Sequence, residues 1–75
     1  MPCISADGKL TSEGRLRLER LRAVKAVSAE EIVSVTGEPL FKVRRSLREL
    51  KTAGYVEESE GKYTVTEQGL KTLNE

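Results

Sequence analysis

The sequence predicts a mainly α fold with a small antiparallel β ribbon, built as one domain from 75 residues. Three observations lead to this prediction. A helix-capping sequence at Ser28 is followed by a glycine turn at Gly37, residues 39–52 carry apolar side chains at helical spacing, and two strand-like runs flank a tight turn at 59–61. A chain of this length holds a single hydrophobic core, so a second domain is excluded.

The first helix is expected after a flexible N-terminal arm formed by residues 1–10, with residues 11–75 as the folded domain. The arm has no hydrophobic period and contains an Asp7-Gly8 turn. Thr11 or Ser12 is a suitable cap for a helix ending near Lys25. We expect its inner side to carry three apolar residues, Leu18, Leu21 and Val24, whereas Leu16 falls on a different side.

A second, short helix begins at Ser28, where Ser28 and Glu31 form a capping box. Thr36-Gly37 ends it, because glycine readily adopts the left-handed turn from which another helix can leave steeply. Pro39 suits the first turn of that next helix, over 39–52. Its apolar stripe consists of Leu40, Val43, Leu47 and Leu50.

The opposite side of helix 39–52 is basic and exposed. At 100° per residue it carries Phe41, Lys42, Arg45, Arg48, Glu49 and Thr52, with Arg44 on the flank. Ala53-Gly54 ends this helix, and residues 55–58 and 62–65 are predicted to pair as strands. A last helix is expected from a Thr66 cap, with Leu70 and Leu73 turned inward.

Composition excludes several classes of function. With no histidine and one cysteine, Cys3, one chain can form neither a Cys/His zinc site nor an intrachain disulfide. No paired carboxylates, phosphate-binding glycine loop or nucleophile and base are visible, so we expect no enzyme activity, no metal and no cofactor. No apolar run approaches the ~20 residues of a membrane span, and no signal peptide is visible, which predicts a cytoplasmic protein without membrane contact.

The charge distribution favours a nucleic-acid partner, although the formal net charge is only +1. Residues 1–52 hold eleven Lys and Arg against seven acids, a balance of +4, whereas residues 53–75 hold two against five, a balance of −3. A basic front with an acidic tail is more typical of nucleic-acid binding than the overall charge is.

The chain resembles the winged helix-turn-helix domains of prokaryotic transcription regulators of the IclR, MarR and ArsR kind, over about residues 15–73. The resemblance rests on the order and spacing of four segments: Glu-Glu-Ile before Thr-Gly, then Val-Arg-Arg-Ser-Leu-Arg-Glu-Leu, Ala-Gly-Tyr-Val, and Tyr-Thr-Val-Thr-Glu-Gln-Gly. It implies a small sequence-specific protein that binds double-stranded DNA and regulates transcription. In such domains the second helix of the motif lies in the major groove and the wing contacts the DNA backbone or minor groove.

Carried over by position, the resemblance implies DNA contacts from residues of helix 39–52 and one wing residue: Phe41, Lys42, Arg44, Arg45, Arg48, Lys51 and Lys62. Arg45 lies at the centre of the outward side and is expected to contact a base, because a guanidinium can donate two bonds to guanine. Arg44, Arg48 and Lys51 are expected to contact phosphates. A homodimer built from the first helix and the C-terminal helix is expected as well, since one recognition helix reads few bases.

Three departures from the pattern keep a second hypothesis open. Glu38 stands where an apolar residue is usual, and Leu40 and Phe41 occupy positions that are often small and polar. The wing carries three acids, Glu57, Glu58 and Glu60. These features favour an adaptor that binds another protein, and RNA is a third class of partner. We expect Phe41 to make a packing or protein contact. The arginines of the first helix are expected to form a solvated face.

Overall fold

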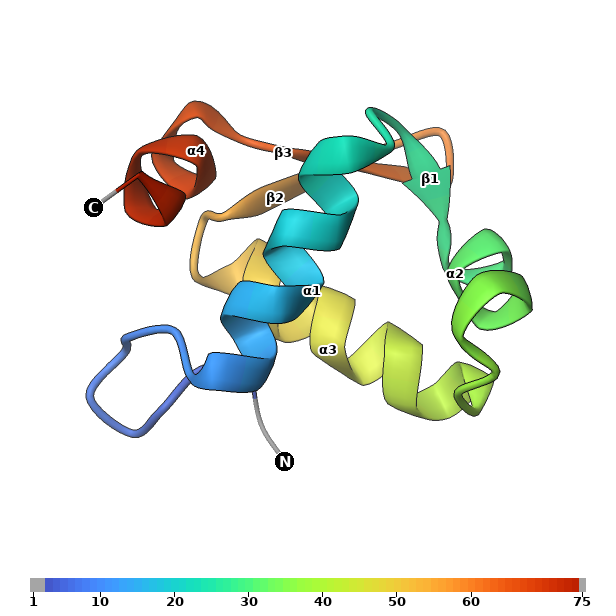
Figure 1. Ribbon diagram of the computed structural model, residues 1–75, viewed down its shortest axis with the longest axis horizontal. Coiled ribbons are helices and arrows are strands. Elements are labelled where there is room, and N and C mark those ends of the chain that lie inside the picture. Colours follow the sequence, from blue (N-terminus) through green and yellow to red (C-terminus); the bar gives the residue numbers. More distant parts are fainter. Residues whose placement is uncertain (1–2, 75) are drawn as a thin grey trace.

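The computed structural model describes residues 3–74 and confirms a mainly helical fold with a small antiparallel sheet (Figure 1). Its elements in chain order are α1 (Ser12–Ala23), β1 (Val27–Ser28), α2 (Ala29–Thr36), α3 (Leu40–Thr52), β2 (Val56–Ser59), β3 (Lys62–Val65) and α4 (Glu67–Leu73). In Figure 1, α2 and the start of α3 lie at one end of the molecule and α4 lies at the other.

Helix α1 begins as predicted but ends before Lys25. The Thr11 hydroxyl accepts a hydrogen bond from the Gly14 amide, and Leu18 and Leu21 are buried. The prediction that Val24 shares their inner side is wrong, because its side chain is 52% exposed. The helix ends at Ala23, and Val24 takes φ −119° and ψ 57°, so the chain has left the helical path by that point.

Residues 3–10 form a turn that rests on the core. Ile4 and Leu10 make an antiparallel bridge, the Thr11 amide donates to the Cys3 carbonyl at 2.9 Å, and Cys3 is buried. Met1 and Pro2 of the expected arm lie outside the described residues. The arm's flexibility stays a prediction, but Cys3 and Ile4 belong to the packed structure.

The turn between α2 and α3 matches the sequence prediction. The Ser28 hydroxyl accepts from the Glu31 amide and the Glu31 carboxylate accepts from the Ser28 amide, both at 3.1 Å, so the capping box is complete. Gly37 has φ +74°, and its amide donates to the Val33 carbonyl at 2.8 Å. A side chain there would meet nothing within 4 Å, so glycine is favoured by the backbone angle alone.

Helix α3 supplies the centre of the core. Val43, Leu47 and Leu50 are fully buried, and Leu40 is partly buried against them. Pro39 is the N-cap with φ −61°, one position before the first helical residue. The helix is therefore held by one side and presents the other to solvent, as its stripe predicts.

The sheet contains one strand more than the predicted ribbon. Its order is β1-β3-β2, and the added strand β1 pairs Val27 with Tyr63 and Ser28 with Lys62. Two residues are too few to show an alternating pattern in the sequence. The β2–β3 turn joins Ser59 to Lys62 through Glu60 and Gly61, both with positive φ, as in two-residue hairpins of type I′.

Helix α4 packs through a glycine. The Thr66 cap is confirmed, since its hydroxyl accepts from the Gly69 amide. Gly69 is buried, and Leu73 is partly buried. The prediction that Leu70 turns inward is wrong: it follows Gly69 by 100° around the helix, and 37% of it is exposed.

Candidate nucleic-acid interface

The outward side of α3 presents all its predicted contact residues to solvent. Phe41, Lys42, Arg44, Arg45, Arg48 and Lys51 are exposed, and Lys62 is exposed where β3 begins, beside the hairpin turn. Their exposure follows from helix geometry, because the core takes the positions at Val43, Leu47 and Leu50. The structure thus brings six of the seven residues together on one helix and leaves Lys62 on the adjoining hairpin.

Arg45 is the more exposed of the two α3 arginines that form an ion pair, Arg44 and Arg45. Its side chain is 78% exposed, and its Nε lies 3.8 Å from Oε2 of Glu49, one turn later. An exposed pair at this spacing is worth about 0.3–0.5 kcal/mol. Arg45 can therefore exchange this contact for another acceptor at little cost.

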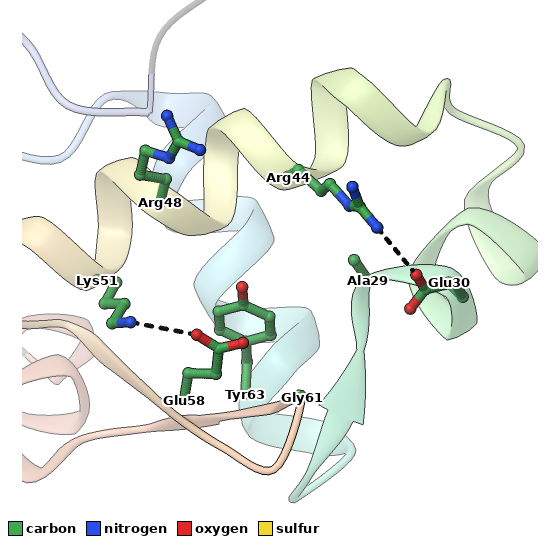
Figure 2. Close-up of a pocket in the computed structure, with 8 residues that line it drawn as sticks. All are labelled: Ala29, Glu30, Arg44, Arg48, Lys51, Glu58, Gly61 and Tyr63. Atoms are coloured by element: carbon green, nitrogen blue, oxygen red, sulfur yellow. Dashed lines mark hydrogen bonds and ion pairs between the residues drawn. The ribbon is translucent and has the colours of Figure 1, made fainter.

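A hollow of about 410 Å³ lies between α3, the start of α2 and the hairpin (Figure 2). Three cations of α3 line one wall, and the other walls come from the start of α2 and from both hairpin strands. The lining consists of Ala29, Glu30, Arg44, Arg48, Lys51, Glu58, Gly61 and Tyr63. Its polar character suits an anion or a nucleic-acid backbone better than an apolar ligand.

Two of the three cations in the hollow already form ion pairs with carboxylates of the same chain. Nη2 of Arg44 lies 3.3 Å from Oε2 of Glu30, and Nζ of Lys51 lies 3.1 Å from Oε1 of Glu58. Figure 2 shows these contacts bridging α3 to α2 and to β2. Both pairs are solvent-accessible and are worth at most about 1 kcal/mol each, so a phosphate could replace either carboxylate.

Arg48 differs from its neighbours in the hollow. It forms no ion pair with any residue from 3 to 74, and in Figure 2 its guanidinium lies across the α3 ribbon from Glu58. Lys42 and Lys62 likewise have no ion pair within the described part of the chain. These three cations need no rearrangement of an internal pair before they contact a phosphate.

Phe41 is 75% exposed on the first turn of α3. The expectation that its ring packs within the domain is wrong, because that turn already buries Val43 and partly buries Leu40. A protein contact at Phe41 stays a prediction. An exposed aromatic ring beside cations can meet either a thymine methyl group or an apolar side chain of a partner.

Glu38 is held by α1 rather than left facing the candidate interface. Nη2 of Arg17 lies 2.8 Å from Oε1 and 2.9 Å from Oε2 of Glu38, and only 10% of the Arg17 side chain is exposed. Partial burial alone would raise the pKa of Glu38, but the hydrogen bond and charge of Arg17, helped by Thr36 and Lys42, lower it. The carboxylate is therefore neutralised within the domain.

The expectation of a solvated basic face on α1 is wrong for two of its arginines. Arg17 binds Glu38, and the Arg15 guanidinium donates to the Thr72 and Leu73 carbonyls, each at 3.3 Å. Arg15 thereby caps the C-terminus of α4, where a cation is favourable. Nothing in the spacing of α1 could reveal these partners, which lie 21 and more than 50 residues away in the sequence.

No group of three or more His, Cys, Asp or Glu side chains among the described residues could hold a metal ion. No described helix is long and apolar enough to cross a membrane. In comparisons with known proteins, the chain matched no protein family, no curated protein and no solved structure.

Proposed function

We propose that this protein binds double-stranded DNA, with the outward side of α3 in the major groove and the β2–β3 hairpin as a wing over the adjacent backbone. The observation that carries the proposal is the exposed row of cations on α3, whose other side is fixed in the core. An α-helix with its side chains is about 10–12 Å across, so a major groove about 12 Å wide admits it, and the 13 residues of α3 make it about 20 Å long.

Different cations have different roles in this proposal. Arg45, central and loosely paired, contacts a base edge, whereas Arg48 and Lys42 contact phosphates without first breaking an ion pair. Arg44 and Lys51 exchange Glu30 and Glu58 for phosphate oxygens. Lys62 meets the backbone beside the hairpin turn, and the acidic residues of that hairpin disfavour deep insertion into a minor groove.

We further propose that the protein acts as a small transcription regulator by occupying a promoter, as the resemblance implies. Two copies bound to adjacent half-sites would read enough bases for useful specificity. Regulation is proposed to depend on the amount of protein or on a partner.

A salt titration of binding to random-sequence duplex DNA tests the proposal. Each phosphate contact should contribute about −0.9 to the slope of log K against log salt concentration, so the five proposed contacts give a slope of about −4.5. The matched control is Arg22→Ala, an exposed α1 arginine outside the candidate interface, which should leave the slope unchanged. No binding at low salt, or a slope near zero, would refute DNA binding.

One observation favours the alternative, an adaptor that binds another protein through the same helix. Phe41 is 75% exposed, and exposed aromatic residues are typical anchors of protein interfaces. If Phe41→Ala abolishes capture of a defined protein partner while Arg45→Ala and Arg48→Ala bind DNA like the parent, the adaptor function replaces the DNA-binding one.

A further inference from the structure

The first turn of α3 carries an apolar ring in the middle of its cationic side. Phe41 is 75% exposed, and the side chain of Arg45, four residues later, is 78% exposed. Residues four apart on a helix lie one above the other, about 6 Å apart along the axis and about 40° apart around it. Phe41 and Arg45 therefore form one row along the outward side of α3.

Cations flank this row on both sides. At 100° per residue, Lys42 lies about 60° from Arg45 around the helix axis. Arg44 and Lys51 lie about 100° and about 120° from Arg45 in the opposite direction. A helix seated in a major groove has base edges beneath its central row and a phosphate backbone along each side. With its flanking cations against the two backbones, α3 directs Phe41 at the base edges.

The first half of α3 is the half that can approach the bases most closely. The second half borders a hollow shared with the turn of residues 3–10, whose lining includes Ile4, Gly8, Arg48, Glu49 and Thr52. Figure 1 shows this turn at the other end of the molecule from the start of α3. Glu49 is the one acid of α3, and the charge of Glu38 before the helix is compensated by Arg17. The N-terminal residues of a recognition helix are also those that contact base edges in helix-turn-helix proteins.

A base edge in the major groove offers one apolar group to a phenyl ring. Guanine, cytosine and adenine present hydrogen-bond acceptors and donors there, and thymine alone adds a methyl group, at C5. The side chain of Phe41 has no donor or acceptor, so it gains nothing from the polar groups, whereas contact with the methyl group removes apolar surface of both from water. The chemistry of this side chain therefore selects thymine.

We propose that Phe41 contacts the C5 methyl group of a thymine while Arg45 contacts a guanine, so that the preferred site holds a T·A pair about one or two base pairs from a G·C pair. The spacing follows from the separation of about 6 Å between the two residues along α3, because successive base pairs rise by about 3.4 Å. The inference rests on the proposed DNA binding and adds to it the identity of two bases.

The charges around Phe41 disfavour a protein as its partner. Three cations, Lys42, Arg44 and Arg45, lie within one turn of it. Covering them with the apolar core of a protein interface would remove them from water without giving them acceptors, which costs free energy. A DNA groove instead gives each of them a phosphate or a base acceptor.

The test is selection of duplexes from a random library by the full chain and by its variants. The parent should enrich a T·A pair about one or two base pairs from a G·C pair. Phe41→Ala should keep the G·C pair and lose the preference for thymine, whereas Arg45→Ala should do the reverse. Val24→Ala changes an exposed apolar residue outside α3, so this matched control should select the same duplexes as the parent.

A change in the DNA alone then measures the methyl contact. Deoxyuridine in place of the selected thymine keeps the base pair and every hydrogen-bonding group and removes only the C5 methyl group. It should weaken binding by the parent about fourfold, the effect of one methyl group lost from an apolar contact, and should leave binding by Phe41→Ala unchanged. Circular dichroism confirms that each variant is folded.

The outcomes separate this inference from the function on which it rests. No binding of any duplex at low salt would overturn both. Salt-dependent binding without a preference for thymine, or an equal effect of deoxyuridine on the parent and on Phe41→Ala, would overturn the inference and leave DNA binding in place. If Phe41→Ala selects the same duplexes as the parent but no longer captures a defined protein partner, Phe41 belongs to a protein interface and the inference is wrong.

Discussion

Arg17 in α1 and Glu38 in the turn before α3 form an ion pair with a 2.8 Å contact between Nη2 and Oε1. The pair joins segments 21 residues apart in the chain and fixes the end of the α2–α3 turn against α1. It also accounts for a carboxylate at a position where the resemblance leads one to expect an apolar residue. Glu38 therefore repels an approaching phosphate less than its position in the sequence implies, because its charge is compensated within the domain.

Glu38→Gln should destabilise the protein by about 1–2 kcal/mol at pH 7, because it leaves the largely buried Arg17 guanidinium without its charged acceptor. The pKa of Glu38 is lowered in the fold, so the pair stabilises the fold above the ordinary carboxyl pKa of about 4.3 and loses this effect as pH falls through the lowered value. Unfolding by urea at a series of pH values from 7 downward measures both. A difference between parent and variant that does not shrink as the carboxyl group of Glu38 becomes protonated would contradict this explanation.

Arg45→Ala should leave stability unchanged, because the side chain is 78% exposed. At a cognate DNA site it should cost about 1–3 kcal/mol and relax specificity at one base step. Arg48→Ala should instead weaken binding to all sequences about equally and reduce the salt slope by roughly one. Fluorescence anisotropy on cognate and random duplexes measures both effects, and equal losses on both duplexes for Arg45→Ala would contradict a base contact.

Glu58→Gln should strengthen binding to random duplex DNA, because it frees Lys51 and removes one negative charge beside the phosphates. The expected gain is at most about 1 kcal/mol at low salt and should fade as salt rises. Glu30→Gln should act in the same way through Arg44. Glu19→Gln, an exposed change on α1 outside the hollow, is the matched control, and an equal gain in that variant would indicate only a general charge effect.

Gly69→Ala should destabilise the fold more than Gly61→Ala. A Cβ at Gly69 would lie 2.5 Å from the Tyr55 carbonyl oxygen and 2.8 Å from Cγ1 of Val65, so α4 must move, at a cost of about 2 kcal/mol or more. At Gly61 a Cβ meets nothing within 4 Å, and only the positive φ opposes it, at about 1 kcal/mol. Thermal unfolding gives the order; the reverse order would show that α4 is loosely attached.

A homodimer built from α1 and α4 stays a prediction, and the exposure of Leu16 and Leu70 agrees with it. Leu16→Gln combined with Leu70→Gln should then lower the dimer fraction without unfolding the monomer, because both side chains are at least one-third exposed. Light scattering over a range of concentrations, with and without DNA, measures the change. An 8.3 kDa species at every concentration without DNA, together with one chain for each bound DNA duplex, would refute the dimer.

Local patterns in the sequence determined the four helices, the β2–β3 hairpin and most of the exposed face of α3. The capping box at Ser28, the left-handed turn at Gly37 and the stripe through Val43, Leu47 and Leu50 each act within a few residues, so their outcome depends little on the rest of the chain. The exposure of Arg45 and Arg48 follows from the same helical period. These features could be predicted because their causes lie within one or two turns of the backbone.

The tertiary structure alone decided which charged side chains have partners within the domain and which apolar residues remain exposed to solvent. The partners of Arg15 and Arg17, the pairing of β1 with β3 and the outward position of Leu70 depend on contacts between segments distant in the chain. Periodicity specifies which side chains share a side of a helix, but it does not specify what packs against that side or where a chain leaves the helix. Such contacts are set by the packing of the whole core. Gly69 lets α4 lie close to the Tyr55 carbonyl, and Val24 remains exposed where the chain leaves α1.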